Sequence, residues 1–196
     1  MDNTDHLAFP DARLAYEGQA VVRWHLRGHG NSVSQEDPKP RTHRSFDETD
    51  WAKCVGDLAF IVGKSREFVR DDFPDASPPL VLIGEGFGAL VALQYAREHG
   101  GVDAVVMASP PASQHGIDGE ALMKDFEAAP LLFFVSENDA TRFASTYTLH
   151  ELAPEFGEIR VYPGSARGVD LFNDKPGSVD QLLYWLEQVL PKPDAV

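Results

Sequence analysis

Two kinds of apolar pattern alternate along the chain. Between residues 45 and 70, apolar side chains recur at helical spacing, and Ser45 and Glu48 have the spacing of a capping box at the start of this segment. The run 79–83 is instead short, continuously apolar and bounded by prolines and glycines, which is typical of a strand buried on both faces. The pattern therefore predicts an amphipathic helix followed by a buried strand.

The rest of the chain repeats this alternation. Strands are predicted at 19–26, 102–108, 131–136 and 159–162, and helices at 89–96, 120–128, 141–152 and 179–190. Gly100 and Gly101 stand where glycine caps the helix that starts at 89. The turn-rich stretch 27–44 is expected to be a long loop, and 191–196 a linker-like end. The order predicts an α/β protein, a doubly wound, mostly parallel sheet with helices on both faces.

Composition narrows the choice of partners. The length of 196 residues predicts a single domain over residues 1–196. With 31 acidic and 17 basic residues the net charge is -14, which disfavours nucleic acid and anionic membranes as partners. The start, Met1 to Pro10, has no signal-peptide pattern, and we expect a soluble, cytoplasmic chain. The single cysteine, Cys54, lies in a helical pattern and is predicted to be a buried small hydrophobe.

The loops that follow the predicted strands carry the candidate chemistry, because ligands of open α/β sheets bind beyond the carboxyl ends of the strands. Four such segments stand out: 25–32 (HLRGHGNS), 84–88 (GEGFG), 136–139 (SEND) and 162–168 (YPGSARG). In this order they resemble four motifs of the α/β-hydrolase family of esterases and lipases. These are the turn D-L-R-G-H-G-x-S, the nucleophile elbow G-x-S-x-G, the acid-bearing strand end and the histidine-bearing turn Y-P-G-x-x-H-G.

The resemblance implies a degenerate catalytic triad. It places Gly86, which has no side chain, at the nucleophile position. It places Arg167 at the position of the base, and a guanidinium with a pKa above about 12 cannot accept a proton at neutral pH. Asp139 stands at the acid position, yet the acid of a triad only orients and stabilises its histidine. The resemblance predicts a protein that does not hydrolyse esters.

The resemblance also implies a truncated fold. Members of the family normally begin with a strand and a loop that supplies one oxyanion-hole amide, and only about 18 residues precede the strand predicted at 19–26. The Phe87 amide is then the only obvious donor of the hole. We therefore predict a pseudoenzyme that binds a small, possibly anionic ligand or a protein partner. The predicted binding residues are Gly86, Phe87, Arg167, Asp139, His29 and His115.

Other interpretations remain open at this point. One is a serine hydrolase that uses non-standard residues, such as Ser109 or Ser165 with His115 or His29. For Arg167 and Asp139, an ion pair that joins two loops is favoured over an anion site made by the guanidinium and the amides of the next helix. Glu85, beside the nucleophile position, is interpreted as a neighbour of the pocket.

Cofactor and metal sites are less favoured. Gly84, Gly86 and Gly88 with Ala89 formally match a dinucleotide-binding turn, but the next predicted strand ends at Ala108 without the acidic residue that such sites require. The loop histidines His25, His29 and His115 lack a cysteine or carboxylate at metal-ligand spacing. We therefore predict no cofactor and no metal, and we interpret His29 as a brace of the turn in which it lies.

Overall fold

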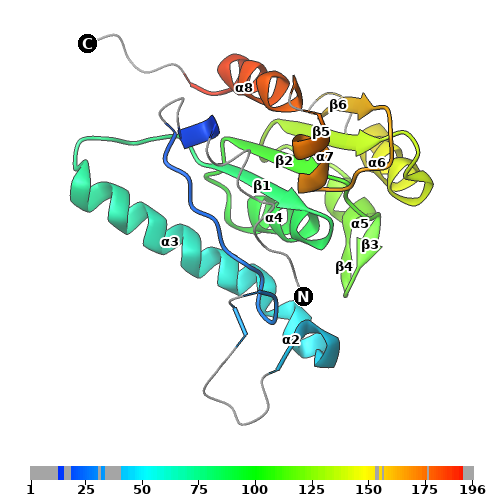
Figure 1. Cartoon of the computed structure of the whole chain (residues 1–196). Helices are drawn as coiled ribbons and strands as arrows, with labels where there is room; N and C mark the ends of the chain where they lie inside the picture. Colours follow the sequence, from blue (N-terminus) through cyan, green and yellow to red (C-terminus); the bar gives the residue numbers. More distant parts are fainter. Residues whose placement is uncertain are drawn as a thin grey trace.

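The centre of the molecule is a four-stranded parallel sheet with the strand order β1-β2-β5-β6 (Figure 1). The structure is a computed structural model that describes residues 13–15, 19–30, 32–33, 41–152, 155, 157–175 and 177–191. The strands are β1 (Val81–Glu85), β2 (Ala104–Ala108), β5 (Leu131–Ser136) and β6 (Gly157–Tyr162). Every residue of the central strands β2 and β5 is buried, as their continuous apolar runs predict.

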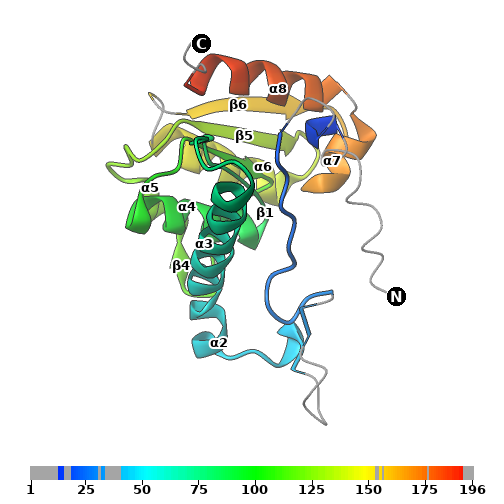
Figure 2. The ribbon, with the colours of Figure 1, turned by 90° about the vertical axis from the view of Figure 1, so that its left-hand side faces the viewer.

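Helices cover both faces of this sheet, so the predicted fold class is confirmed (Figure 2). The helices are α2 (Glu48–Ala52), α3 (Cys54–Asp72), α4 (Phe87–His99), α5 (Gly119–Met123), α6 (Ala140–Leu152), α7 (Val169–Asp174) and α8 (Gly177–Val189). Alternate strand residues point to opposite faces. Val105 and Met107 pack with α3 and α4, whereas Val106 and Phe134 pack with α7 and α8.

Several predicted elements differ from the structure. Residues 19–26 form no strand, because they pair with none of the strands among the described residues. The helix predicted over 45–70 is two helices separated by Lys53, and its capping box joins Asp47 to Asp50, not Ser45 to Glu48. Ser45 instead ends the short 3-10 helix η2 (His43–Ser45). The helix predicted to reach residue 128 ends at Met123.

Two short elements were not predicted from the sequence. A hairpin joins β3 (Ser113–Gln114) to β4 (Ile117–Asp118), and α7 follows Gly168. The hairpin turn is His115–Gly116, both with positive φ, the backbone that a two-residue hairpin turn requires. The predictions for Met1 to Pro10, for Asn31 and 34–40 of the long loop, and for 192–196 concern residues outside the described ranges.

The remaining helix predictions hold. Gly100 has φ +63° and caps α4, as predicted.

Cys54 is fully buried, and burial raises the pKa of its thiol to about 11, so the thiolate is scarce at neutral pH. Within the ranges that the structure describes, no helix combines the length and the apolar character that crossing a bilayer requires.

Candidate functional site

The elbow, defined here as residues 84–88, turns directly from β1 into α4. At its centre Gly86 has φ +52° and ψ -120°, a backbone that side-chain-bearing residues rarely adopt. A Cβ at Gly86 would meet no atom within 4 Å. At Gly84, by contrast, a Cβ would lie 2.6 Å from the Cα of Ala89, so the first turn of α4 passes too close for any side chain there. The elbow is therefore tightly packed beneath Gly86 and open above it.

Ser109 and Glu85 hold the loop that begins α7. The hydroxyl of Ser109, which is only 2% exposed, accepts a hydrogen bond from the Gly168 backbone N–H at 3.0 Å. The carboxyl of Glu85 lies against Gly168, where a Cβ would collide with it, and accepts a hydrogen bond from the Val169 N–H. Burial, followed by the nearby charge of Asp170, raises the pKa of Glu85 despite that hydrogen bond. Glu85 thus supports the loop, in keeping with its predicted place beside the pocket.

Arg167 and Asp139 form the predicted ion pair between two loops. The guanidinium Nη2 donates to Oδ1 of Asp139 at 2.7 Å, and Nε lies 2.5 Å from Oδ2. The Asp139 side chain is 1% exposed, whereas that of Arg167 is 60% exposed. Asp139 also accepts a hydrogen bond from the Arg142 N–H in the first turn of α6. The Asp139 carboxylate therefore interacts with the Arg167 guanidinium and with the first turn of α6, rather than with a histidine.

The predicted histidines gather elsewhere, around Trp51. The rings of Trp51 and His115 are stacked, with centroids 3.6 Å apart, and Phe87 meets His115 edge-on at 5.0 Å. His29 lies 6.1 Å from Trp51 and stacks on His43 at 4.1 Å. We call these residues, together with Phe46, the aromatic cluster; Phe46 meets Trp51 edge-on at 5.1 Å.

His29 also braces its own turn, as predicted. Its Nδ1 lies 3.0 Å from the carbonyl oxygen of Arg27, to which it donates, and its backbone N–H donates to the carbonyl of Leu26. Arg27 in turn forms an ion pair with Asp57 of α3. This turn is thereby fixed to α3 while the ring of His29 reaches the aromatic cluster.

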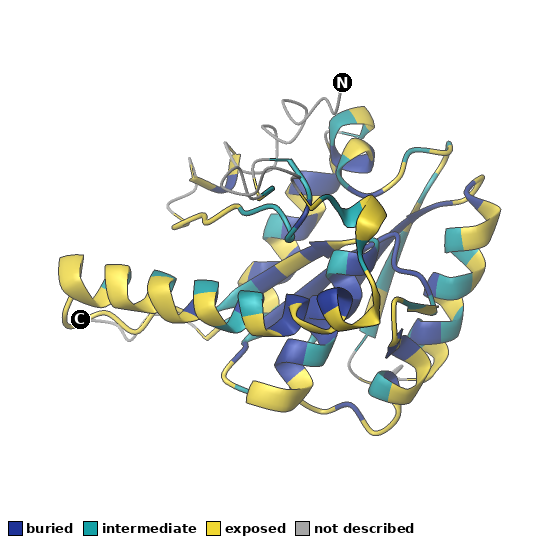
Figure 3. Cartoon of the chain, turned by 90° about the horizontal axis from the view of Figure 1, so that it is seen from below, coloured by how far each residue is buried: buried dark blue, intermediate teal, exposed yellow. Residues whose placement is uncertain are grey.

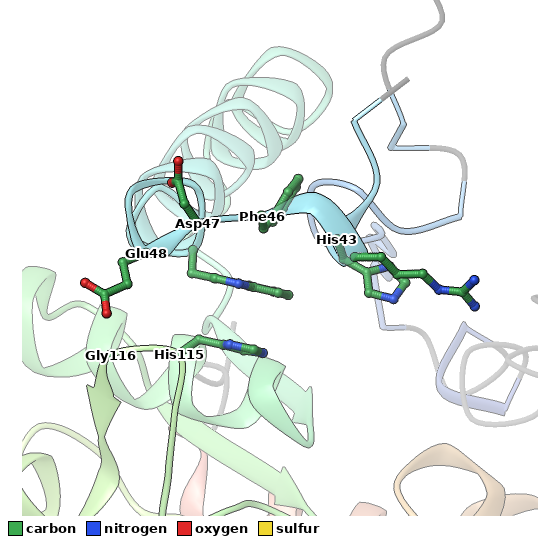
Figure 4. Close-up of a pocket in the computed structure, with 8 residues that line it drawn as sticks. His43, Phe46, Asp47, Glu48, His115 and Gly116 are labelled. Carbon is green, nitrogen blue, oxygen red and sulfur yellow. The ribbon is translucent and has the colours of Figure 1, made fainter. Parts of the chain in front are cut away.

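An open groove of about 730 Å³ runs along the aromatic cluster, between the stretch 43–51 and the hairpin turn His115–Gly116. Figure 4 shows His43 and Phe46 approaching it from one segment of the chain and His115 from another. Burial and the nearby His29 lower the pKa of His115, which is therefore neutral at pH 7.

The predicted site residues thus form two groups that meet at the elbow. Phe87, directly after Gly86, belongs to the aromatic cluster with His29 and His115. Arg167 precedes Gly168, which contacts Glu85 on the other side of Gly86. Sequence reasoning missed His43, Phe46 and Trp51, because Trp51 is indistinguishable from an ordinary core position of a helix. Among the described residues, no three histidine, cysteine or carboxylate side chains are arranged to hold a metal ion.

Comparison with known proteins identifies the family. The model of the serine aminopeptidase family S33 matches residues 5–136, more than half of the chain. The chain therefore belongs to this family of the α/β-hydrolase superfamily, and the parallel sheet with the elbow between β1 and α4 is the fold expected of it. No curated protein sequence matches the chain.

Solved esterase structures share the fold. An esterase from Pyrococcus furiosus superposes with a TM-score of 0.68 at 18% identity, over 96% of this chain and 77% of that one. Esterases from Exiguobacterium antarcticum and a Rhodococcus species each give a TM-score of 0.64, at 13% and 15% identity. These alignments cover 94% of this chain in both cases, and 88% and 87% of the respective esterases. At such low identity the likeness is one of fold.

Proposed function

We propose that this chain is a non-catalytic α/β-hydrolase that binds a small ligand, such as an anion, or a protein partner beside the elbow. One observation carries the proposal: the residue at the centre of the elbow is Gly86, which offers no nucleophile, and the space above it is open. The residue at the base position is Arg167, and its guanidinium is engaged by Asp139. A cleft that keeps its shape without its reactive groups is suited to binding.

Other nucleophiles of the chain are poorly placed for catalysis. Ser109 is buried, and the polar partner of its hydroxyl is the Gly168 N–H rather than a base. The pKa of Cys54 is raised to about 11 by burial. Ser165 is exposed, but the ring of His115 stacks on Trp51 and bonds to the side chain of Gln114. Catalysis through non-standard residues is therefore the weaker alternative.

Ester hydrolysis tests the loss of catalysis. We expect the wild type to hydrolyse short-chain nitrophenyl esters no faster than Gly86→Ala, and a fluorophosphonate probe to leave it unlabelled. A side chain at 86 has room, although the backbone there is one that side-chain-bearing residues rarely adopt, and we expect the double variant Gly86→Ser, Arg167→His to remain poor. Each missing oxyanion-hole donor costs about 100- to 1000-fold in rate. Turnover by the wild type clearly above that of Gly86→Ala would overturn the proposal.

A thermal-shift titration tests ligand binding. Phosphate, citrate and butyrate are titrated against the wild type, Arg167→Ala and His115→Ala, and each Tm is compared with that of the same variant without ligand. A ligand at 100 times its Kd stabilises the folded state by about 2.7 kcal/mol. We expect one of these anions to raise the Tm of the wild type more than that of either variant. Equal shifts in all three proteins would exclude an anion site at the elbow. Binding of a protein partner would then be the remaining part of the proposed function.

A further inference from the structure

The strand β6 stands at one side of the sheet. In the part of the chain that the structure describes, it pairs with β5 and with no other strand. Helix α8 lies on one side of β6 and α6 on the other, which leaves its outer edge between them (Figures 1 and 2). In Figure 3 buried residues fill the middle of the molecule, and exposed residues lie toward its periphery. Accordingly, no residue of β6 is buried, whereas every residue of its neighbour β5 is.

Alternate residues of β6 direct their backbone groups away from β5. Just beyond the end of β5, the Glu137 N–H donates a hydrogen bond to the Tyr162 carbonyl, so the backbone of Tyr162 faces β5. Because backbone groups alternate in direction along a strand, every second residue before Tyr162 also faces β5, and the residues between them face outward. The outward residues are Gly157, Ile159 and Val161.

Side chains, rather than a strand, meet two of the outward carbonyls. The Arg160 guanidinium donates to the carbonyl of its neighbour Ile159 at 3.3 Å, and the His150 ring of α6 donates to the carbonyl of Gly157 at 3.0 Å. Arg160 also forms an ion pair with Glu158 at 2.7 Å, and the Glu158 side chain is 52% exposed. Exposed ion pairs of this kind contribute little to stability, so Arg160 and Glu158 can exchange each other for new partners at small cost.

A second copy of β6 fits this edge in one register. A two-fold axis perpendicular to the sheet brings two β6 strands together antiparallel, with outward residues opposite outward residues. If the axis passes through Ile159, then Glu158 stands opposite Arg160 of the second copy, and Arg160 stands opposite its Glu158. In the same register Val161 stands opposite Gly157, which has no side chain to oppose it. Opposite charges at facing positions stabilise a strand pair.

The α6 side of this edge is apolar and partly exposed. Ile159 packs against the core on this side, and Val161 shares its face of the strand and is 38% exposed. The side of α6 from which His150 reaches β6 also carries Phe143 and Tyr147, whose ring centroids lie 4.7 Å apart. Tyr147 is 37% exposed. A second copy at the edge would cover these apolar side chains.

We propose that the outer edge of β6 is a dimer interface, at which two copies of this chain pair antiparallel about Ile159 and their sheets join into one. The charges identify the occupant as a second copy, because the sequence of residues 158–160, Glu-Ile-Arg, is its own complement across a two-fold axis. An axis through Val161 would instead place Arg160 opposite Tyr162 and form neither ion pair. This surface is distinct from the groove and the elbow and does not rest on the proposed function.

Sedimentation velocity tests the dimer in about 0.15 M sodium chloride, where salt screens the repulsion between two copies that each carry a net charge of -14. We expect the wild type to change from monomer to dimer between about 1 and about 100 μM. Glu158→Arg places positive charges opposite each other across the axis, and Arg160→Glu places negative charges there. Each single variant should raise the dimer Kd about tenfold or more.

Exchanging the two charges should restore the dimer. The double variant Glu158→Arg, Arg160→Glu again places opposite charges at facing positions, and an equal mixture of the two single variants should form a heterodimer for the same reason. Glu67→Arg is the matched control, because Glu67 is an exposed member of an ion pair with Lys64 on α3 and its substitution changes the net charge equally. This control should leave the dimer Kd unchanged.

Amide hydrogen exchange supplies a second measurement that needs no variant. Exchange of Ile159 and Val161 should slow as the wild-type concentration is raised, and exchange of β1 should not. A wild type that stays monomeric throughout the concentration range, or a dimer that the single variants leave intact, would overturn the proposal. So would a folded double variant that stays monomeric, because the charges of Glu158 and Arg160 would then not face each other across the axis.

Discussion

At the scale of single residues, the proposed function rests on Gly86 and Arg167. Gly86 has the strained backbone of a strand-to-helix elbow but presents no side chain. Arg167 forms an ion pair with the buried Asp139. Glu85 is the residue beside them whose ionisation the fold opposes, because burial and Asp170 both raise its pKa. The sign of this shift leads to a prediction about stability.

Glu85→Gln is expected to stabilise the protein at neutral pH. The folded-state pKa of Glu85 lies above its ordinary value of 4.5. Between these two pKa values the folded chain holds a proton on Glu85 that the unfolded chain has released. Stability is therefore lost as the pH rises from about 4.5 through the raised pKa, and a neutral glutamine avoids this loss. Thermal melts should show a higher Tm for Glu85→Gln at pH 7 and a vanishing difference near pH 4.

Glu187→Gln serves as the control for this measurement. Glu187 is exposed on α8, and the substitution removes the same charge at a position away from the loop of Gly168 and from Asp170. If both variants raise the Tm at pH 7 equally, the effect comes from net charge, and the local account of Glu85 is wrong.

At the scale of elements, Gly84 and Gly63 differ in the space that their surroundings leave for a side chain. Gly84 lets β1 and α4 approach closely, because a Cβ there would lie 2.6 Å from Ala89. Gly63 lies within α3 and is exposed, and a Cβ there would meet nothing within 4 Å. The same substitution should therefore change stability in opposite directions at the two positions.

Gly84→Ala is expected to lower the free energy of unfolding by about 1–3 kcal/mol, because the backbone of α4 must shift. Gly63→Ala should raise it by about 0.5–1 kcal/mol, because alanine restricts the unfolded chain and favours the helix. Urea unfolding of the two variants and the wild type measures both changes. A stabilising Gly84→Ala would show that the elbow is looser than its geometry indicates.

At the scale of the whole molecule, negative charge is in large excess. The net charge of -14 produces a self-repulsion that unfolding relieves. Salt screens this repulsion, because the Debye length falls from about 30 Å at 0.01 M to about 8 Å at 0.15 M ionic strength. We therefore expect the Tm to rise between these two sodium chloride concentrations.

A less acidic variant tests whether charge is the cause. Asp75, Glu127 and Glu155 are exposed, and replacing all three by lysine reduces the negative charge. The Tm of this triple variant should depend less on salt than that of the wild type. An unchanged salt dependence would exclude net repulsion as the source of the effect.

Much of the fold follows from local pattern. The strands β1, β2 and β5, the helices α4, α6 and α8 and the glycine cap of α4 were all predicted, since periodicity and turn residues indicate which elements are buried. The expectation that β1 is buried on both faces was wrong, because Ile83 is 39% exposed and Glu85 is exposed on one face of this strand. The order of elements then specifies a parallel sheet with helices on both faces, because parallel strands require crossover connections. The ion pair of Arg167 with Asp139 was also anticipated, because the carboxyl ends of parallel strands meet at one edge.

Only the tertiary structure shows which predicted elements pair and which side chains pack together. Segment 19–26 has the sequence of a strand but pairs with no strand that the structure describes, because a strand depends on a neighbour that no local pattern reveals. The stacking of His115 on Trp51 likewise depends on a hairpin that brings together residues far apart in the chain. Sequence alone determined most of the elements and which residues stand at the triad positions, whereas long-range packing determined the groove and the order of the strands.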